Sequence, residues 1–190
     1  APGRLGEYLG LTSDRMDAGD ALHAGFADYF IPESDWDALK SRLCETGDWE
    51  NVDRAARPAP ASRLADWQPD IDACFGGETL GDIYRAFPDP APEAIQHAQK
   101  SMARNSPLAM ACTLQIIHKV RGPDNIRTAL DHEYRYTSRA MEKGDFLEGI
   151  RAAIIDKDRS PRWKHAGWQD VTGADIMAMA YPVTDQPLEF

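Results

Sequence analysis

The amino-acid sequence predicts a mostly α-helical chain with at most one or two short strands. Apolar residues recur every three or four positions through most of the second half, and helix-capping residues precede several of these stretches. Only one short aromatic stretch suits a strand. With 190 residues, of which 43% are hydrophobic, the chain can bury a core of ordinary size.

The first part of the chain, residues 1–45, is expected to contain short helices and one strand. Leucine and tyrosine side chains follow a helical spacing from Leu5 onward. Asp17 stands where the N-cap of a second helix is expected. The aromatic stretch 26–32 ends in proline and favours a short strand, and Ser34 is the expected N-cap of the helix that follows.

Residues 46–70 are expected to form a long surface connection with no more than a turn of helix. Glycine, several prolines and scattered charges interrupt any regular apolar period there. The Pro-Ala tract within it is expected to be stiff, because each proline fixes φ and biases the residue before it away from helix.

Residues 71–190 are expected to form a helical carboxyl-terminal region. Thr79 and Ser106 are candidate N-caps, and Pro92 suits the first turn of the helix between them. A further helix is expected over about 124–143.

A dense cluster of charges follows the next expected helix. Asp145 and Glu148 match the acidic version of a capping box at the start of this helix, which ends before Pro161. Near its end lie Asp156, Lys157, Asp158 and Arg159. Mixed charge at a helix end is usually solvated, so the carboxylates of the cluster are interpreted as structural rather than as an acid-base pair.

Composition excludes several classes of function. The formal net charge of −10 opposes binding to nucleic acid, and no apolar stretch is long enough to cross a bilayer. Cys44, Cys74 and Cys112 lie far apart and indicate a reducing compartment. No spacing of histidines or cysteines suits a metal, and no nucleophile elbow or phosphate loop occurs. We therefore expect a soluble, cytoplasmic protein without nucleic-acid or membrane partners.

The order of four local patterns resembles a known family. They are "GRLGEYLGLTSDRMDAGDALHAGFADYFIP", "SPLAMACTLQII", "EYRYTSRAMEKGDFLEGIRAAIIDKDRSPRW" and the closing "LEF". Together they resemble the carboxyl-terminal half of 3-hydroxyisobutyryl-CoA hydrolases, which are members of the crotonase (enoyl-CoA hydratase/isomerase) superfamily. The resemblance implies that this chain is the helical carboxyl-terminal part of an α/β crotonase fold.

This resemblance implies hydrolysis of a short 3-hydroxyacyl-CoA thioester in valine breakdown by the intact enzyme. Coenzyme A would be part of the substrate, with no separate cofactor and no metal. The family's oxyanion hole and catalytic carboxylates precede the region that is matched, so no catalytic residue is assigned here, and this chain alone is expected to be inactive. Expected partners are acyl-CoA, the missing amino-terminal half and further copies in a homo-oligomer. In a eukaryote the expected compartment is the mitochondrial matrix.

Lys157 and Arg159 are the candidate residues for binding a CoA phosphate, because cations beside a helix end can meet this anion. The alternative, favoured by the local charge pattern, is that they form ion pairs with Asp156 and Asp158. Related hydratases place a phenylalanine against the CoA adenine about where Ala153 stands here, so an adenine contact from this helix is not expected. Two other functions stay open, an enoyl-CoA hydratase or isomerase of the same fold and a non-catalytic helical interaction module.

Overall fold

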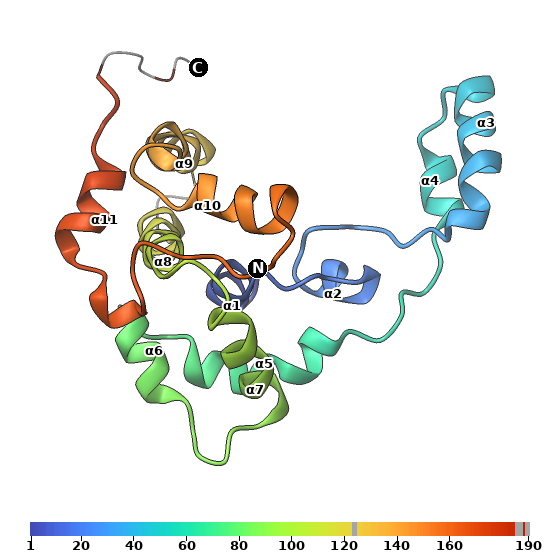
Figure 1. Cartoon of the computed structure of the whole chain (residues 1–190). Coiled ribbons are helices and arrows are strands. Elements are labelled where there is room, and N and C mark those ends of the chain that lie inside the picture. The colour runs from blue at the N-terminus through green and yellow to red at the C-terminus, as the bar shows by residue number, and fades with distance from the viewer. Residues whose placement is uncertain (123–124, 185–187, 189–190) are drawn as a thin grey trace.

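The computed structural model describes residues 1–122, 125–184 and 188, and the regular structure in this part is helical, as the sequence predicts (Figure 1). The α-helices are α1 (Leu5–Thr12), α2 (Ala18–His23), α3 (Trp36–Thr46), α4 (Glu50–Ala55), α5 (Arg63–Cys74), α6 (Leu80–Ala86), α7 (Glu93–Met102), α8 (Pro107–Arg121), α9 (Ile126–Ala140), α10 (Phe146–Ile150) and α11 (Gly173–Ala180). Two 3-10 turns, η1 (Glu33–Asp35) and η3 (Trp168–Asp170), and one π-helical segment, η2 (Arg151–Ile155), complete them.

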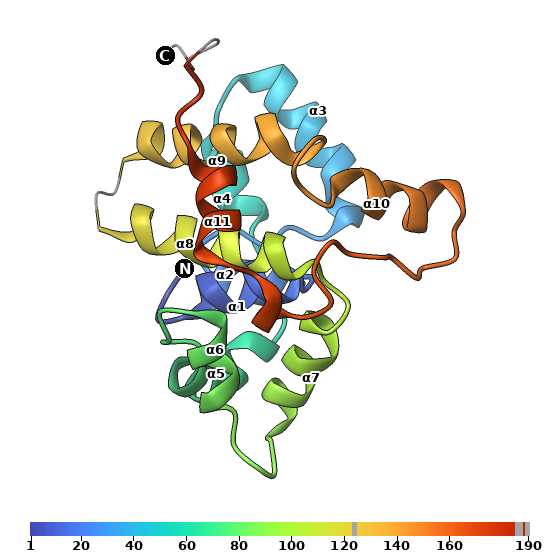
Figure 2. The same cartoon turned by 60° about the vertical axis from the view of Figure 1, so that its left-hand side comes forward.

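Helix α1 lies at the centre of the main core, between α8 on one side and α5 and α7 on the other (Figures 1 and 2). Its Tyr8 ring is fully buried and meets the Phe75 ring edge-on, with ring centroids 5.3 Å apart. A smaller second core joins α8, α9 and α11 around Leu108, Cys112 and Met179. The largest other side chains of the main core are those of Leu5, Leu11, Leu64, Ile71, Ile83, Ile95, Met102 and Leu114.

Side-chain caps start several helices where the sequence predicts them. The Ser106 hydroxyl accepts the Ala109 N–H at the start of α8 (3.1 Å), and Asp17 accepts the Asp20 N–H at the start of α2 (2.8 Å). Thr79 and Asp82, three residues later, form a complete capping box at the start of α6. These caps are confirmed, because each satisfies a backbone N–H that the helix itself leaves unpaired.

The stretch 46–70 is more regular than predicted, since it contains α4 and the beginning of α5. Ser62 starts α5 by accepting the Ala65 N–H (3.0 Å), and the helix then includes Pro69 at the loss of one backbone hydrogen bond. The expectation of a long irregular connection is therefore wrong. The division into parts 1–45, 46–70 and 71–190 remains a prediction.

The expected strand at 26–32 consists of a single bridge, in which the Arg57 N–H donates to the Phe30 carbonyl (2.9 Å). Ser34 does not cap α3; its hydroxyl donates to the neighbouring Asp35 carboxylate (3.1 Å). The expected start of a helix at Asp124 lies outside the described residues, as do the last two residues of the closing "LEF".

Helices α3 and α4 pack on each other and stand apart from the body of the molecule, joined to it by two extended segments (Figure 1). We call residues 36–55, which contain these two helices and the turn between them, the α3–α4 hairpin. No residue of α3 is buried, and the Trp36 and Trp49 side chains are 50% and 70% exposed. The hairpin therefore has no apolar core of its own comparable to the one around α1.

Candidate functional site

Asp145 joins three segments beneath the predicted charge cluster instead of capping α10. Its buried carboxylate accepts the Ser106 hydroxyl (2.5 Å) and the backbone N–H of Lys164 (2.9 Å). No side-chain cap forms at the start of α10, so the predicted capping box with Glu148 is wrong. The Asp145 carboxylate bonds to the buried Ser106 hydroxyl rather than to the backbone N–H groups of α10, because this hydroxyl would otherwise lack an acceptor.

Arg151 organises the charge cluster. Its guanidinium lies 2.8 Å from Glu148, 2.5 Å from Asp156 and 2.7 Å from Asp158. It also donates to the Ser160 carbonyl (3.1 Å), which fixes the path of the chain after η2. One arginine thus pairs with three carboxylates that the sequence places on both sides of it.

These contacts lower the pKa values of the carboxylates. Hydrogen bonds from Arg151, followed by one from the backbone N–H of Arg162, lower the pKa of Glu148 to about 2. The same guanidinium lowers the pKa of Asp158 from its ordinary value. Both groups are therefore ionised near neutral pH and hydrogen-bonded, which suits a structural role better than proton transfer.

Lys157 and Arg159 do not pair with their acidic neighbours. Both residues have left-handed backbone conformations, with φ values of 56° and 53°, and the Arg159 N–H donates to the Ala152 carbonyl (3.0 Å). Among the described residues, no ion pair forms to either cation, because Arg151 occupies both aspartates. The ion pairs that the local charge pattern favours are therefore wrong, and the two cationic side chains are exposed.

A basic cavity of about 450 Å³ lies beside this turn. Arg104, Arg159 and Arg162 line it together with His165, and we call it the cationic cavity. Lys157 does not line it. Three arginines line this one space. A guanidinium attracts an anion and can form paired hydrogen bonds to phosphate or carboxylate oxygens.

An apolar cavity of about 300 Å³ adjoins the cationic one. Phe146, Ile150 and Ile154 line it from α10 and η2. Trp163 lines both cavities, and its indole N–H donates to the Arg104 carbonyl (3.2 Å). The two cavities together can accommodate a molecule with an anionic part and an apolar part. We call them the paired cavities.

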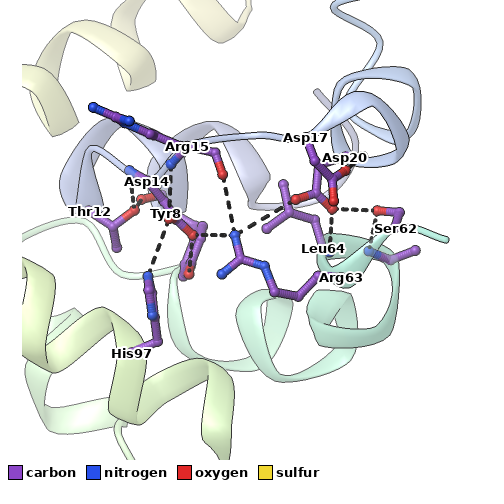
Figure 3. A network of polar contacts seen from close by, with 11 residues as sticks. Tyr8, Thr12, Asp14, Arg15, Asp17, Asp20, Ser62, Arg63, Leu64 and His97 are labelled. Atoms are coloured by element: carbon purple, nitrogen blue, oxygen red, sulfur yellow. Dashed lines mark hydrogen bonds and ion pairs between the residues drawn. The ribbon is translucent and has the colours of Figure 1, made fainter. Parts of the chain in front are cut away.

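A polar network lies elsewhere, at the packing of α1 and α2 on α5 (Figure 3). The Asp14 carboxylate accepts from the Tyr8 hydroxyl (3.2 Å) and from the Arg63 guanidinium (2.8 Å), and it lies 3.3 Å from His97 Nε2. Burial, followed by the nearby Asp14 charge, raises the pKa of Tyr8 far above its ordinary value. The residue types resemble an acid-base site, and sequence analysis did not single them out.

The second half of this network explains its role. The Asp20 carboxylate accepts from the Ser62 hydroxyl (2.8 Å) and from the Leu64 N–H (2.8 Å), while Arg63 bridges toward Asp14 (Figure 3). These bonds fasten the start of α5 to α2. None of the network side chains lines the paired cavities, so we assign the network to folding.

Arg104 carries no local signal that sequence reasoning could have used, whereas Trp163 ends one of the patterns on which the family resemblance rests. Arg104 lies in the turn after α7 and meets Arg159 only through the tertiary fold. In the part of the chain that the structure covers, no cluster of three or more histidine, cysteine or acidic side chains could hold a metal ion. The described helices also include none with the length and apolarity that a membrane crossing requires.

Comparisons with known proteins place this geometry in context. The sequence model of the family described as enoyl-CoA hydratase/isomerase matches residues 1–180. The mitochondrial 3-hydroxyisobutyryl-CoA hydrolase of Rattus norvegicus is 30% identical over 99% of this chain. That match covers 51% of the rat protein, so the chain spans about half the length of this curated relative.

Two solved structures are similar in fold as well. The crystal structure of an enoyl-CoA hydratase from Rhodobacter sphaeroides is 47% identical, with a TM-score of 0.89 over 100% of this chain and 55% of that chain. A carnitinyl-CoA dehydratase from Mycobacterium thermoresistibile is 33% identical, with a TM-score of 0.87 over 96% of this chain and 53% of that one. The predicted resemblance is therefore confirmed by sequence and by structure. This chain belongs to the enoyl-CoA hydratase/isomerase family.

Proposed function

We propose that this chain is the CoA-binding, carboxyl-terminal part of an enzyme that hydrolyses a short 3-hydroxyacyl-CoA of the 3-hydroxyisobutyryl-CoA type, a step of valine breakdown. The rat relative matches almost the whole of this chain, and its name supports this substrate class. The observation that carries the proposal is the pairing of a cationic cavity with an apolar one around Trp163.

The paired cavities suit the two chemical halves of an acyl-CoA. Phosphate groups of the CoA would lie on Arg159 and its neighbouring arginines, whose planar forks suit phosphate oxygens. Lys157, exposed on the same turn, would add positive charge at the rim. The less polar arm would extend past Trp163 toward Phe146 and Ile154.

The same geometry argues against a catalytic base within the charge cluster. Glu148 and Asp158 have lowered pKa values, and Arg151 occupies both of them. The buried Asp145 already accepts two hydrogen bonds. A carboxylate held in this way is a poor proton acceptor near neutral pH. We therefore propose that the groups that activate water and polarise the thioester belong to the amino-terminal half of the enzyme.

Isothermal titration with free CoA tests the binding surface. Arg159→Glu reverses a charge at the cationic cavity, and Lys100→Glu, at an exposed position of α7, makes the same change of charge as the matched control. We expect Arg159→Glu to weaken CoA binding by about tenfold or more, which corresponds to the loss of one charged contact. Equal affinity in the Arg159→Glu and Lys100→Glu variants would exclude the cationic cavity as the CoA site.

A second candidate function is hydration or isomerisation of an enoyl-CoA. The similarity to the Rhodobacter enoyl-CoA hydratase favours it. The two reactions differ in product, because hydrolysis releases a free thiol and hydration removes the conjugated double bond. Parallel assays of the enzyme that contains both halves, with 3-hydroxyisobutyryl-CoA and with crotonyl-CoA, distinguish them by thiol release and by loss of enoyl absorbance.

Compartment and assembly complete the proposal. Acyl-CoA breakdown would place the enzyme in the bacterial cytoplasm or, in a eukaryote, in the mitochondrial matrix. We also propose that the enzyme forms a homo-oligomer, which sedimentation of the protein with both halves would test.

A further inference from the structure

A third cavity is separate from the paired cavities. It has a volume of about 620 Å³ and lies between α6, α8 and the η3 turn that leads into α11. None of its lining residues lines the cationic or the apolar cavity. Its volume is within the range of roughly 300–1,000 Å³ that is usual for small-molecule sites.

The apolar wall of this cavity is held in place. Leu114, Val171 and Ile176 line it beside Trp168, whose ring is stacked on Tyr84 with centroids 5.3 Å apart and planes 11° apart. Gly81 completes the arrangement, because a Cβ atom at this position would lie 2.8 Å from the Trp168 ring carbon Cζ3. The close approach of the helix backbone therefore allows the indole to form a fixed wall.

The lining of the cavity carries charges of both signs. The Arg85 guanidinium is paired with Asp82, and the Glu78 carboxylate lies 3.6 Å from His118 Nδ1. The remaining lining cation is Lys119, which is exposed and for which the described part of the chain provides no ion pair. His118 Nε2 is buried without a hydrogen-bond partner. The cavity thus combines an apolar wall with the Lys119 ammonium, which has no ion pair among the described residues, and the Glu78 carboxylate also lines it.

We propose that this cavity binds a small monocarboxylate with an aromatic or branched aliphatic body. Its carboxylate would pair with the Lys119 ammonium, and its apolar body would lie against Trp168 and Leu114. The side-chain amides of Gln115 and Gln169, which also line the cavity, can hydrogen-bond to further polar groups of such a ligand. This assignment does not depend on the proposed function, since it uses neither the cationic nor the apolar cavity.

Benzoate is a suitable probe, with benzyl alcohol as its neutral analogue of similar shape. Titrations are carried out with this chain or with a longer protein that contains it, and the bound site is located by the NMR signal of the Trp168 indole N–H. We expect benzoate to shift the Trp168 signal while the Trp163 signal stays unchanged. We also expect benzoate to bind at least about tenfold more tightly than benzyl alcohol, because the alcohol lacks the charged contact.

Two variants test the role of the charge. Lys119→Glu should weaken benzoate binding by about tenfold or more, whereas the same change of charge at exposed Lys100 should leave it within about twofold. Three results would each overturn the proposal. They are saturable binding that Lys119→Glu does not weaken, a response at Trp163 instead of Trp168, and no binding of benzoate at concentrations up to about 10 mM. The Trp163 response belongs to the paired cavities, so this test and the CoA titration can fail separately.

Discussion

The body around α1 and the α3–α4 hairpin use similar amphipathic helices with opposite outcomes. In the body, Tyr8 and Phe75 are fully buried, and side-chain caps start most of the longer helices. In the hairpin, Trp36 and Trp49 remain at least half exposed and neither helix has a side-chain cap. The comparison teaches that a 3.6-residue period predicts a helix, whereas burial depends on whether a second surface is available to cover its apolar side.

Truncation of one leucine in each region should give the largest contrast. Leu64→Ala removes a fully buried side chain from the main core and should lower the free energy of unfolding by about 2–5 kcal/mol. Leu39→Ala in the half-exposed hairpin should cost less than about 1 kcal/mol, because solvent already reaches that site. Urea denaturation of both variants measures the difference. Equal losses would mean that the hairpin is as well packed as the body.

The three free cysteines extend the comparison to chemical reactivity. Cys44 lies exposed in the hairpin, whereas Cys74 and Cys112 are buried in the body. Burial raises the pKa of Cys74 and raises that of Cys112 to about 12. Ellman's reagent should therefore react with Cys44 at least about a hundredfold faster than with the other two, because the thiolate is the nucleophile. Three equal rates in the native protein would contradict the burial of the body.

Two arginine networks provide a closer comparison. Arg151 in the body pairs with three carboxylates and is 26% exposed, whereas Arg54 in the hairpin pairs with Asp48 and Glu50 and is 56% exposed. Arg151→Met should lower stability by more than Arg54→Met, because three charged acceptors lose their shared donor. Arg54→Met should cost no more than about 0.5 kcal/mol, as is usual for exposed pairs. Thermal unfolding of both variants measures the two losses of stability. A larger loss for Arg54→Met than for Arg151→Met would contradict this ranking.

The smallest expected effect is on the pH dependence of stability. The pKa of Glu148 is lowered from its ordinary value of 4.5 to about 2, so its ionised form stabilises the fold above about 4.5. This contribution is lost as the pH falls from about 4.5 to about 2, where the folded protein takes up the proton. Glu148→Gln should flatten the stability profile in this window, whereas Glu133→Gln, at an exposed position of α9, should not. Parallel profiles for the two variants would contradict the role of Arg151.

Local signals made much of the fold predictable. Thr79 and Ser106 cap helices as expected, because a capping hydrogen bond needs only residues close in sequence. The α11 helix was missed although Thr172 and Asp175 form the same capping box, a signal that could have been found. Ser62 was overlooked because the neighbouring Pro-Ala tract suggested irregular structure.

The candidate site was less predictable because tertiary contacts decide it. Arg159 was singled out from its place at a helix end, but its expected aspartate partners form ion pairs with Arg151 instead. Competition among several carboxylates for one guanidinium depends on distances that the order of charges does not contain. Arg104 joins the site from a distant segment, so no local pattern could indicate it, whereas Trp163 lies only four residues after Arg159.

The rate at which this chain alone releases free thiol from 3-hydroxyisobutyryl-CoA tests the central claim most directly. The account assigns CoA binding to the paired cavities and the catalytic groups to the amino-terminal half, so it predicts no release above the spontaneous rate. Turnover by the purified 190-residue chain at an enzyme-like rate, of about one per second or more, would contradict it.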